Sequence, residues 1–468
     1  MNDVKRTIRT YLEEHRTEIV SLLRDLISIP SVRGEAVPGA PFGTACADIL
    51  RIIEPHFRDA GCDTELDNDG GYLLAETGCG TRSLGLFAHA DVVPAGEGWM
   101  YTDPFTMLEK DGFLIGRGVM DDKSAVVTSL YCAKMLRELA LPFHSKLVCF
   151  VGCNEESGMQ DIQNYLRAHT PPDFALVPDT AFPLYRGNKG RILIKAHRNA
   201  PLGEIKRVCG GKAGTNVGKA EAVLAYSDDL FADLQSRASD RISVARENHD
   251  IVIRAIGIPR HTALPEGSIN ATALIADTLR SCPFLSAETH RIMEFLYAIC
   301  SDWRGNAVGI ACDDAEFGPL TFVNYMIDTN DTDTALYFNI RFGAAVCADE
   351  MKAVLKHAFA AHGFSVEIES ESHPHIVPRD HSMLRVLLDT YENYTGTKNA
   401  PMHVNAGGTY GQYLPCAAEI GTVMWRHIPF PMPTGHGQVH QPDECISIEG
   451  LLDAMELTML MLIACDRE

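Results

Sequence analysis

Three short apolar segments of the chain each end in polar side chains that can bind a metal ion or move a proton. The segments are SLGLFAH (83–89), KLVCFVG (146–152) and DFALVPD (173–179), and the polar residues at or after their ends are His89, Asp91, Glu155, Glu156 and Asp179. We interpret the segments as strands of a parallel sheet, because their length and composition are typical of buried strands. The carboxyl ends of parallel strands lie at one edge of a sheet, so these side chains should meet in space.

Two further candidates lie elsewhere in the chain. Asp121 follows the segment GFLIGRGVM at the start of a predicted helix, and His440 lies in GHGQVHQPDE. Two imidazoles with several carboxylates suit Zn²⁺, Mn²⁺ or Co²⁺, whereas oxygen ligands alone would indicate Mg²⁺ or Ca²⁺. The carboxylates are numerous enough for two ions that share a bridging carboxylate. Two ions about 3.5–4 Å apart can together activate a water molecule and polarise a carbonyl group. Because Glu155 and Glu156 are adjacent, one can bind metal while the other handles the proton of the water.

Each of these residues has an ordinary structural explanation when it is considered alone. Asp121 would be a helix cap, the pair Glu155–Glu156 a solvated turn, and His89 or His440 a loop histidine. Arg341, which lies in an apolar strand pattern, would form an ion pair at the edge of the core. None of these explanations accounts for the arrival of several such groups together at strand ends.

The elements that must position these residues alternate between strand and helix patterns over the first part of the chain. An amphipathic helix is predicted up to Pro30, and a second helix over 121–140 separates two of the predicted strands. After Gly190 the pattern changes to shorter, more polar strands with two helical stretches, and near residue 377 the first pattern returns. The fold class is therefore predicted to be α/β with a mostly parallel central sheet, formed by residues 1–189 and 377–468 and interrupted by an α+β domain over 190–376.

Composition excludes several classes of function. The chain has 468 residues, of which 46% are hydrophobic and 22% charged, as in ordinary globular proteins. Lys and Arg (41) minus Asp and Glu (62) give a net charge of −21, which is the wrong sign for nucleic acid or an anionic membrane. No apolar stretch approaches the length of a membrane span, and the charged N-terminal segment does not resemble a signal peptide. Fourteen cysteines without a C-x-x-C pair indicate reduced thiols and a cytoplasmic protein.

Taken together, the motifs resemble the M20 family of co-catalytic metallopeptidases, and especially its dipeptidase V (Xaa-His dipeptidase) branch. The matching segments, in order, are AHADVVPAGEGW, GRGVMDDKS, NEESG, PDTAFPLYRGNKG, HTALPEGSINA, NAGGTY and HQPDE. They cover nearly the whole chain. The resemblance implies a zinc-peptidase-like catalytic domain with an inserted lid domain, and two divalent metal ions, Zn²⁺ being expected and Mn²⁺ or Co²⁺ being alternatives.

The resemblance also implies a role for each site residue. One metal would be bound by His89, Asp121 and Asp179, and the other by Asp121, Glu156 and His440. Asp121 would bridge the two ions, and its peptide bond to Asp122 would be cis. Glu155 would be the general base, and Asp91 would orient His89. In the lid, His261 and Asn216 would reach over the substrate and Arg341 would bind its carboxylate, while Gly408 of NAGGTY would contribute to substrate binding.

The function expected from these residues is hydrolysis of the peptide bond of short, unblocked peptides. Glu155 would generate a metal-bridging hydroxide that attacks the carbonyl carbon, and would then protonate the leaving amine. Alternatives are an N-acyl amino acid deacylase or desuccinylase with the same centre, and a non-catalytic homologue that acts as a binding module. A nucleotide-binding enzyme is less favoured, because glycines such as Gly78 and Gly210 do not complete a phosphate-binding motif. The long insertion would replace a dimer partner, so a monomer is expected rather than a homodimer.

Overall fold

The computed structural model describes residues 2–330, 332–424 and 430–468, and the chain divides into two compact units. The discontinuous unit comprises Met1–Gly187 and Ile376–Glu468, and the inserted unit comprises Asn188–His375. The sequence pattern had placed the two boundaries after residues 189 and 376. Each unit has its own hydrophobic core.

A nine-stranded mixed sheet forms the centre of the discontinuous unit. Its order is β1 (Asp63–Asp67), β2 (Tyr72–Thr77), β6 (Lys146–Gly152), β3 (Ser83–His89), β7 (Phe174–Thr180), β21 (Ala417–Gly421), β8 (Leu184–Asn188) and β19 (His375–Ile376), with β20 (Met402–Asn405) paired to β8. The strands β6, β3, β7 and β21 are parallel neighbours, and antiparallel pairs extend the sheet on both sides. The α/β fold class predicted from the sequence is confirmed, with the parallel strands in the middle of the sheet.

The strands that carry the site are the apolar segments identified in the sequence. β3 and β6 have the predicted bounds, and β7 begins and ends one residue later. Both faces of these strands are buried: on β3, Leu86 belongs to the core on one face and Phe87 to the core on the other. A parallel strand covered on both faces is apolar along its whole length, which is why these segments stand out in the sequence.

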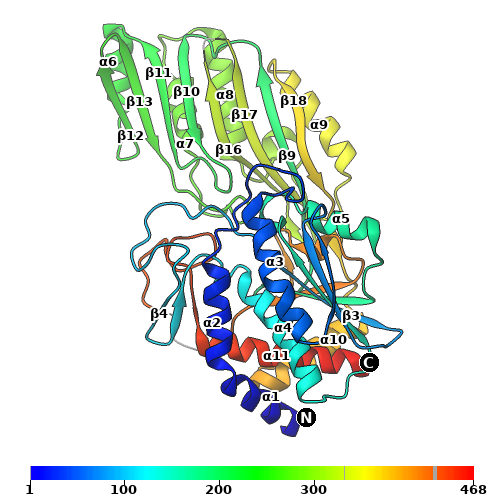
Figure 1. Ribbon diagram of the computed structural model, residues 1–468. Helices are drawn as coiled ribbons and strands as arrows, with labels where there is room; N and C mark the ends of the chain where they lie inside the picture. The colour runs from blue at the N-terminus through cyan, green and yellow to red at the C-terminus, as the bar shows by residue number, and fades with distance from the viewer. Residues whose placement is uncertain (1, 331, 425–429) are drawn as a thin grey trace. The chain divides into compact units, whose positions relative to one another are not determined.

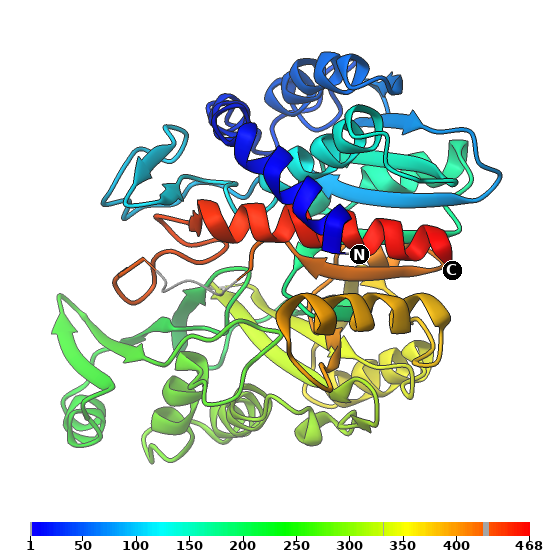
Figure 2. The same ribbon diagram turned by 90° about the horizontal axis from the view of Figure 1, so that it is seen from below.

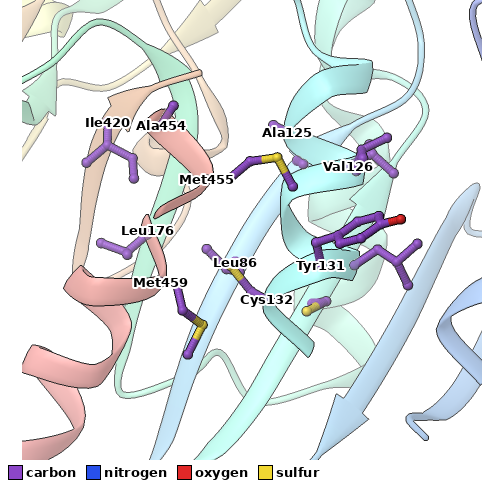
Figure 3. Close-up of a cluster of buried hydrophobic side chains, with 14 of the residues drawn as sticks. Leu86, Ala125, Val126, Tyr131, Cys132, Leu176, Ile420, Ala454, Met455 and Met459 are labelled. Carbon is purple, nitrogen blue, oxygen red and sulfur yellow. The ribbon is translucent and has the colours of Figure 1, made fainter. Parts of the chain in front are cut away.

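Helices cover both faces of this sheet. One face packs against α2 (Arg16–Ile27), α3 (Thr44–Asp59), α4 (Lys123–Glu138) and α11 (Ile448–Arg467), and the other face packs against α5 (Gln160–Ala168). In Figure 3, Leu86 of β3 lies between Cys132 of α4 and Met455 and Met459 of α11. Helices α1 (Asn2–Glu14) and α10 (Ser382–Thr395) lie alongside α11 (Figure 2). No helix of the described residues is long and apolar enough to cross a membrane.

The predicted opening helix is two helices, α1 and α2, which meet at His15. His15 Nδ1 lies 2.8 Å from the backbone carbonyl of Tyr11, which also accepts the backbone N–H of His15. A side chain that binds a carbonyl of the helical hydrogen-bond ladder bends the helix at that point. The apolar periodicity continues through the bend, so the sequence pattern did not reveal it.

Segments that are far apart in the sequence meet in a small three-stranded sheet of the discontinuous unit. Its order is β22 (Cys445–Ser447), β5 (Phe113–Ile115) and β4 (Leu108–Lys110). The pairing of β22 with β5 brings the segment after His440 beside the segment that leads to Asp121. Two predicted metal ligands that are far apart in the sequence are thereby placed close together.

The inserted unit is an antiparallel sheet of eight strands with helices. The strand order is β12 (Ile242–Glu247), β13 (Asp250–Ile256), β11 (Lys219–Ala225), β10 (Ile205–Gly211), β16 (Thr321–Thr329), β17 (Thr334–Phe342), β9 (Gly190–Arg198) and β18 (Ser365–Ser372). The helices are α6 (Asp228–Ser236), α7 (Ala271–Arg280), α8 (Ala287–Ser301) and α9 (Ala348–Ala360), two more than the sequence pattern indicated. Helices α7, α8 and α9 lie behind the sheet in Figure 1, and their apolar faces form one core with it. A two-stranded pair, β14 (Asp313–Asp314) with β15 (Gly318–Pro319), completes the unit.

Candidate metal centre

The ends of β3 and β7 bring together a first group of possible metal ligands in the discontinuous unit. His89 is the last residue of β3 and is only 1% exposed, and Asp179 lies near the end of β7. His89 Nε2 is 3.1 Å from Asp121 Oδ1 and 3.7 Å from Asp179 Oδ1. One ligand atom from each of the three residues lies within 4.8 Å of the others.

A second group shares Asp121 with the first. His440 Nε2 lies 3.0 Å from Asp121 Oδ2 and 3.1 Å from Glu156 Oε2. Asp121 therefore turns one carboxylate oxygen toward each imidazole. The peptide bond between Asp121 and Asp122 is cis, as the family resemblance implied.

The chemistry and spacing of these atoms fit two divalent cations. Two ligand atoms at about 2 Å from one tetrahedral ion lie about 3.3 Å apart, which is close to the distances of 3.0–3.7 Å between the imidazole nitrogens and the carboxylate oxygens. His89 Nε2 and Glu156 Oε1 are buried and make no hydrogen bond among the described residues. Burial and the charge of Asp121 raise the pKa of Glu156 to about 7. Bound cations would remove this repulsion between carboxylates.

His89 is held in the tautomer that a metal ligand requires. Its Nδ1 lies 3.0 Å from the backbone carbonyl of Asp91 and 3.5 Å from the carboxylate Oδ1 of the same residue. Since a carbonyl oxygen only accepts hydrogen bonds, Nδ1 carries the proton, and the lone pair of Nε2 faces Asp121 and Asp179. The Asp91 carboxylate accepts the backbone N–H groups of Glu155 and Glu156, each at 3.1 Å. Asp91 therefore contacts both the histidine and the loop that follows β6.

Glu155, the base expected from the family resemblance, is a buried carboxylate directly after Asn154 and before Glu156. It begins the short helix η1 (Glu155–Ser157), is 8% exposed, and its Oε1 is buried without a hydrogen-bond partner among the described residues. Burial raises its pKa well above the usual value, and the charge of Asp179 raises it further. A carboxylate that the fold leaves without a donor beside a candidate metal centre can accept a proton from water.

Glu444 is a structural contributor to the site that the sequence reasoning missed, although it ends the motif HQPDE. It is fully buried and accepts the backbone N–H groups of Gly118, Met120 and Asp121 at 2.8–3.2 Å. Its other partner is Arg117, whose Nη1 lies 2.6 Å from Glu444 Oε2. Glu444 therefore ties the segment that ends in Asp121 to the segment that begins with His440. The polar motif HQPDE does not predict that its last residue, Glu444, is buried.

Asp161 plays a similar part on the other side of the centre. Its Oδ2 accepts the backbone N–H of Asn154 at 2.7 Å and the hydroxyl group of Tyr410 at 2.5 Å. Asn154 directly precedes Glu155, so this buried contact holds the start of the loop that carries the base. Burial raises the pKa of Asp161 to about 7. From the sequence, an aspartate inside α5 with polar neighbours would be predicted to be exposed, whereas Asp161 is fully buried.

His261 and Asn216 lie together in the inserted unit. Asn216 is 1% exposed: its Oδ1 accepts the backbone N–H of Arg260 at 2.6 Å, and its Nδ2 donates to the carbonyls of Ile258 and Ile269. The carboxamide therefore holds the segment next to His261. His261 is exposed, and its Nδ1 accepts the backbone N–H of Ala263 at 3.3 Å. An Nδ1 that accepts leaves the proton of the neutral ring on Nε2.

Arg341 and Gly408 complete the set of residues identified from the sequence. Arg341 lies on β17, is 7% exposed, and donates from Nε to Asn339 Oδ1 at 3.1 Å. The ion pair that would explain a buried arginine structurally does not form within 4.0 Å among the described residues. Gly408 lies between β20 and the short helix η3 (Tyr410–Gln412), and a Cβ at this position would approach the Gln412 side chain to 3.2 Å.

Comparisons with known proteins match this arrangement to one family. Residues 85–464 match the model of peptidase family M20/M25/M40. The β-Ala-Xaa dipeptidase of Lactobacillus delbrueckii subsp. lactis is 29% identical over 429 residues, which cover 87% of this chain and 89% of that protein. YtjP of Bacillus subtilis strain 168 is 27% identical over 458 residues, which cover 94% and 96%.

A solved structure shows the same fold. Human carnosine dipeptidase 1 aligns with a TM-score of 0.60 and 16% identity, over 99% of each chain. The match to the family model spans most of the chain, and it includes every residue of the two candidate ligand groups. The chain belongs to the M20/M25/M40 peptidase family, and it is a metal-dependent hydrolase.

Proposed function

We propose that the protein is a two-metal dipeptidase of the dipeptidase V branch, which hydrolyses the peptide bond of short, unblocked peptides. The observation that carries this proposal is the placement of Asp121, whose two carboxylate oxygens each contact one imidazole at 3.0–3.1 Å. The names of two similar proteins, a β-Ala-Xaa dipeptidase and carnosine dipeptidase 1, support a dipeptide as the substrate.

The two groups of residues divide the metal ions between them. His89, Asp121 and Asp179 would hold one ion, and Asp121, Glu156 and His440 would hold the other. Two bound ions of Zn²⁺, or of Mn²⁺ or Co²⁺, would lower the pKa of water and polarise the scissile carbonyl. Asp91 would fix the His89 ring through its backbone carbonyl.

Glu155 would transfer the proton. Its buried Oε1 accepts a proton from the attacking water and then returns it to the amine that leaves. The backbone N–H of Glu155 is bound to Asp91, so the same residue positions the base and a metal ligand. Because Asp91 contacts both residues, it would keep the distance between Glu155 and His89 constant through the reaction.

Residues of the inserted unit would act as a lid on the substrate. His261 would donate from Nε2 to the oxyanion that develops on the former carbonyl oxygen. Asn216 would support it by holding the neighbouring backbone, because its carboxamide is already bound to that segment. Arg341 would bind the substrate carboxylate with the terminal nitrogens that Asn339 leaves available, and Gly408 would allow close approach of the substrate to the backbone.

The substrate class separates this proposal from a deacylase with the same centre. The full-length protein, stripped of metal and refilled with Zn²⁺, Mn²⁺ or Co²⁺ in turn, should hydrolyse free dipeptides. It should leave N-acetylated and N-succinylated amino acids nearly untouched. Release of amino acids measured by chromatography checks this, and a clear preference for the blocked substrates would replace the dipeptidase by a deacylase. Absence of turnover with either class would favour a binding module.

Replacement of Asp121 tests the bridge. Asp121→Ala removes an oxygen from both ligand groups, so both ions should bind weakly and metal content should fall below one ion per chain. Elemental analysis after dialysis measures the ratio, with Asp240→Ala, at an exposed position, as the control. Retention of two ions per chain by Asp121→Ala would show that Asp121 does not bridge them.

Replacement of Glu155 tests the base. Glu155→Gln keeps the size of the side chain but cannot accept a proton, so kcat should fall by roughly 10²–10⁴-fold with metal content unchanged. The exposed Glu14→Gln is a matched control that should behave as the wild type. A kcat for Glu155→Gln within a few-fold of the wild type would remove Glu155 from proton transfer.

Replacement of His261 tests the lid donor. Loss of one oxyanion donor costs roughly 10²–10³-fold in kcat, so His261→Ala should lower kcat far more than it changes KM. Metal content should stay the same, because His261 is not a proposed ligand. Leu264→Ala, in the same loop and 64% exposed, is the control. An unchanged kcat in His261→Ala would mean that another group stabilises the oxyanion.

A further inference from the structure

Two arginines lie directly opposite each other on the sheet of the inserted unit. Arg191 of β9 pairs with Arg341 of β17 in the antiparallel register. Directly opposed residues in such a pair have Cβ atoms about 4.5–5.5 Å apart, and like charges at this spacing destabilise the sheet. An anion bound to both guanidinium groups would offset this repulsion.

Both arginines lie on the face of the sheet away from the helices. Ile192 and Ile194 of β9, and Phe338 and Ile340 of β17, belong to the core that the sheet forms with its helices. Since alternate residues of a strand point to opposite faces, Arg191 and Arg341 share the other face. Ser372 of β18 lies on the far side of Arg191, and it contributes a hydroxyl group rather than a carboxylate.

No acidic side chain of the described residues pairs with either guanidinium within 4.0 Å. Burial lowers the pKa of Arg341 to about 9, and the charge of Arg191 acts in the same direction. Glu369 of β18 interacts with the hydroxyl group of Tyr325.

A third cation adds to the positive charge. Lys189 is 6% exposed, and its Nζ donates to the carbonyl of Pro319 at 2.6 Å. Burial lowers the pKa of Lys189; the charge of Glu266 raises it, and the charge of Arg341 lowers it. Lys189 is therefore bound to the backbone and increases the local potential, while among the described residues the two arginines make one side-chain hydrogen bond, from Arg341 Nε to Asn339.

We propose that Arg191 and Arg341 together bind two carboxylates of one substrate residue, so that the protein prefers dipeptides whose C-terminal residue is Asp or Glu. This inference rests on the proposed dipeptidase function, in which Arg341 binds the α-carboxylate. Arg191 then binds the side-chain carboxylate, which a short hydrocarbon chain separates from the first. Each planar guanidinium can hold a carboxylate with two parallel hydrogen bonds.

A pair of dipeptides that differ only in charge tests the preference. The metal-loaded, full-length protein should hydrolyse Ala-Glu with a kcat/KM at least about tenfold higher than that for Ala-Gln, since a hydrogen bond to a charged group contributes at least that factor. Arg191→Gln should lose this factor, so that it hydrolyses Ala-Glu and Ala-Gln with similar kcat/KM. Lys195→Gln, which removes a charge from the same face of β9 farther from Arg341, should retain the preference.

Binding of the free amino acids separates this inference from the dipeptidase function. L-Glutamate should bind at least about tenfold more tightly than L-glutamine in an NMR titration of the full-length protein, and Arg191→Gln should abolish the difference. This result would support the Arg191 site even if no dipeptide were hydrolysed, in which case the dipeptidase function alone would fail. Equal affinities for the two amino acids, or a preference that survives in Arg191→Gln, would overturn the inference.

Discussion

Buried negative charge at the carboxyl ends of the parallel strands is the constraint on which this site depends. A carboxylate removed from water must receive hydrogen bonds or cations, and the fold supplies these to some of the acidic residues. Asp91 and Asp161 accept backbone N–H groups, and Glu444 accepts three of them in addition to Arg117. Glu155 and Glu156 each have a buried carboxylate oxygen without a hydrogen-bond donor among the described residues. These oxygens can therefore interact with a metal ion or with water.

The satisfied carboxylates also connect the segments that carry the unsatisfied ones. Asp91 links the end of β3 to the loop after β6, and Glu444 links the start of α4 to the C-terminal loop. These links use backbone N–H groups, whose directions the chain path determines. Candidate ligands from four distant segments therefore lie at distances close to 3 Å from one another.

The sequence predicted the strands of the centre well because both faces of these strands are buried. Continuous apolar residues over 83–89 and 146–152 leave little freedom in the bounds of β3 and β6, and the polar residue after each strand then lies at the sheet edge. Glu444 could not be predicted, since its burial depends on the pairing of β22 with β5. The register between strands is likewise absent from a single sequence, so the opposition of Arg191 and Arg341 appeared only in the structure.

A metal centre of this kind does not by itself distinguish one peptide substrate from another. In the proposed function, the ions held by His89, Asp121 and the other candidate ligands would act on water and on the carbonyl group, and every peptide presents the same carbonyl group. Discrimination between substrates must therefore come from side chains that contact the rest of the molecule. In the inserted unit, the proposed side chains Arg191 and Arg341 lie on the sheet face opposite the apolar core. Under the proposed function, a change at Arg191 would alter the substrate preference while Arg341 and the candidate metal ligands stayed in place, so specificity would vary without loss of the catalytic chemistry.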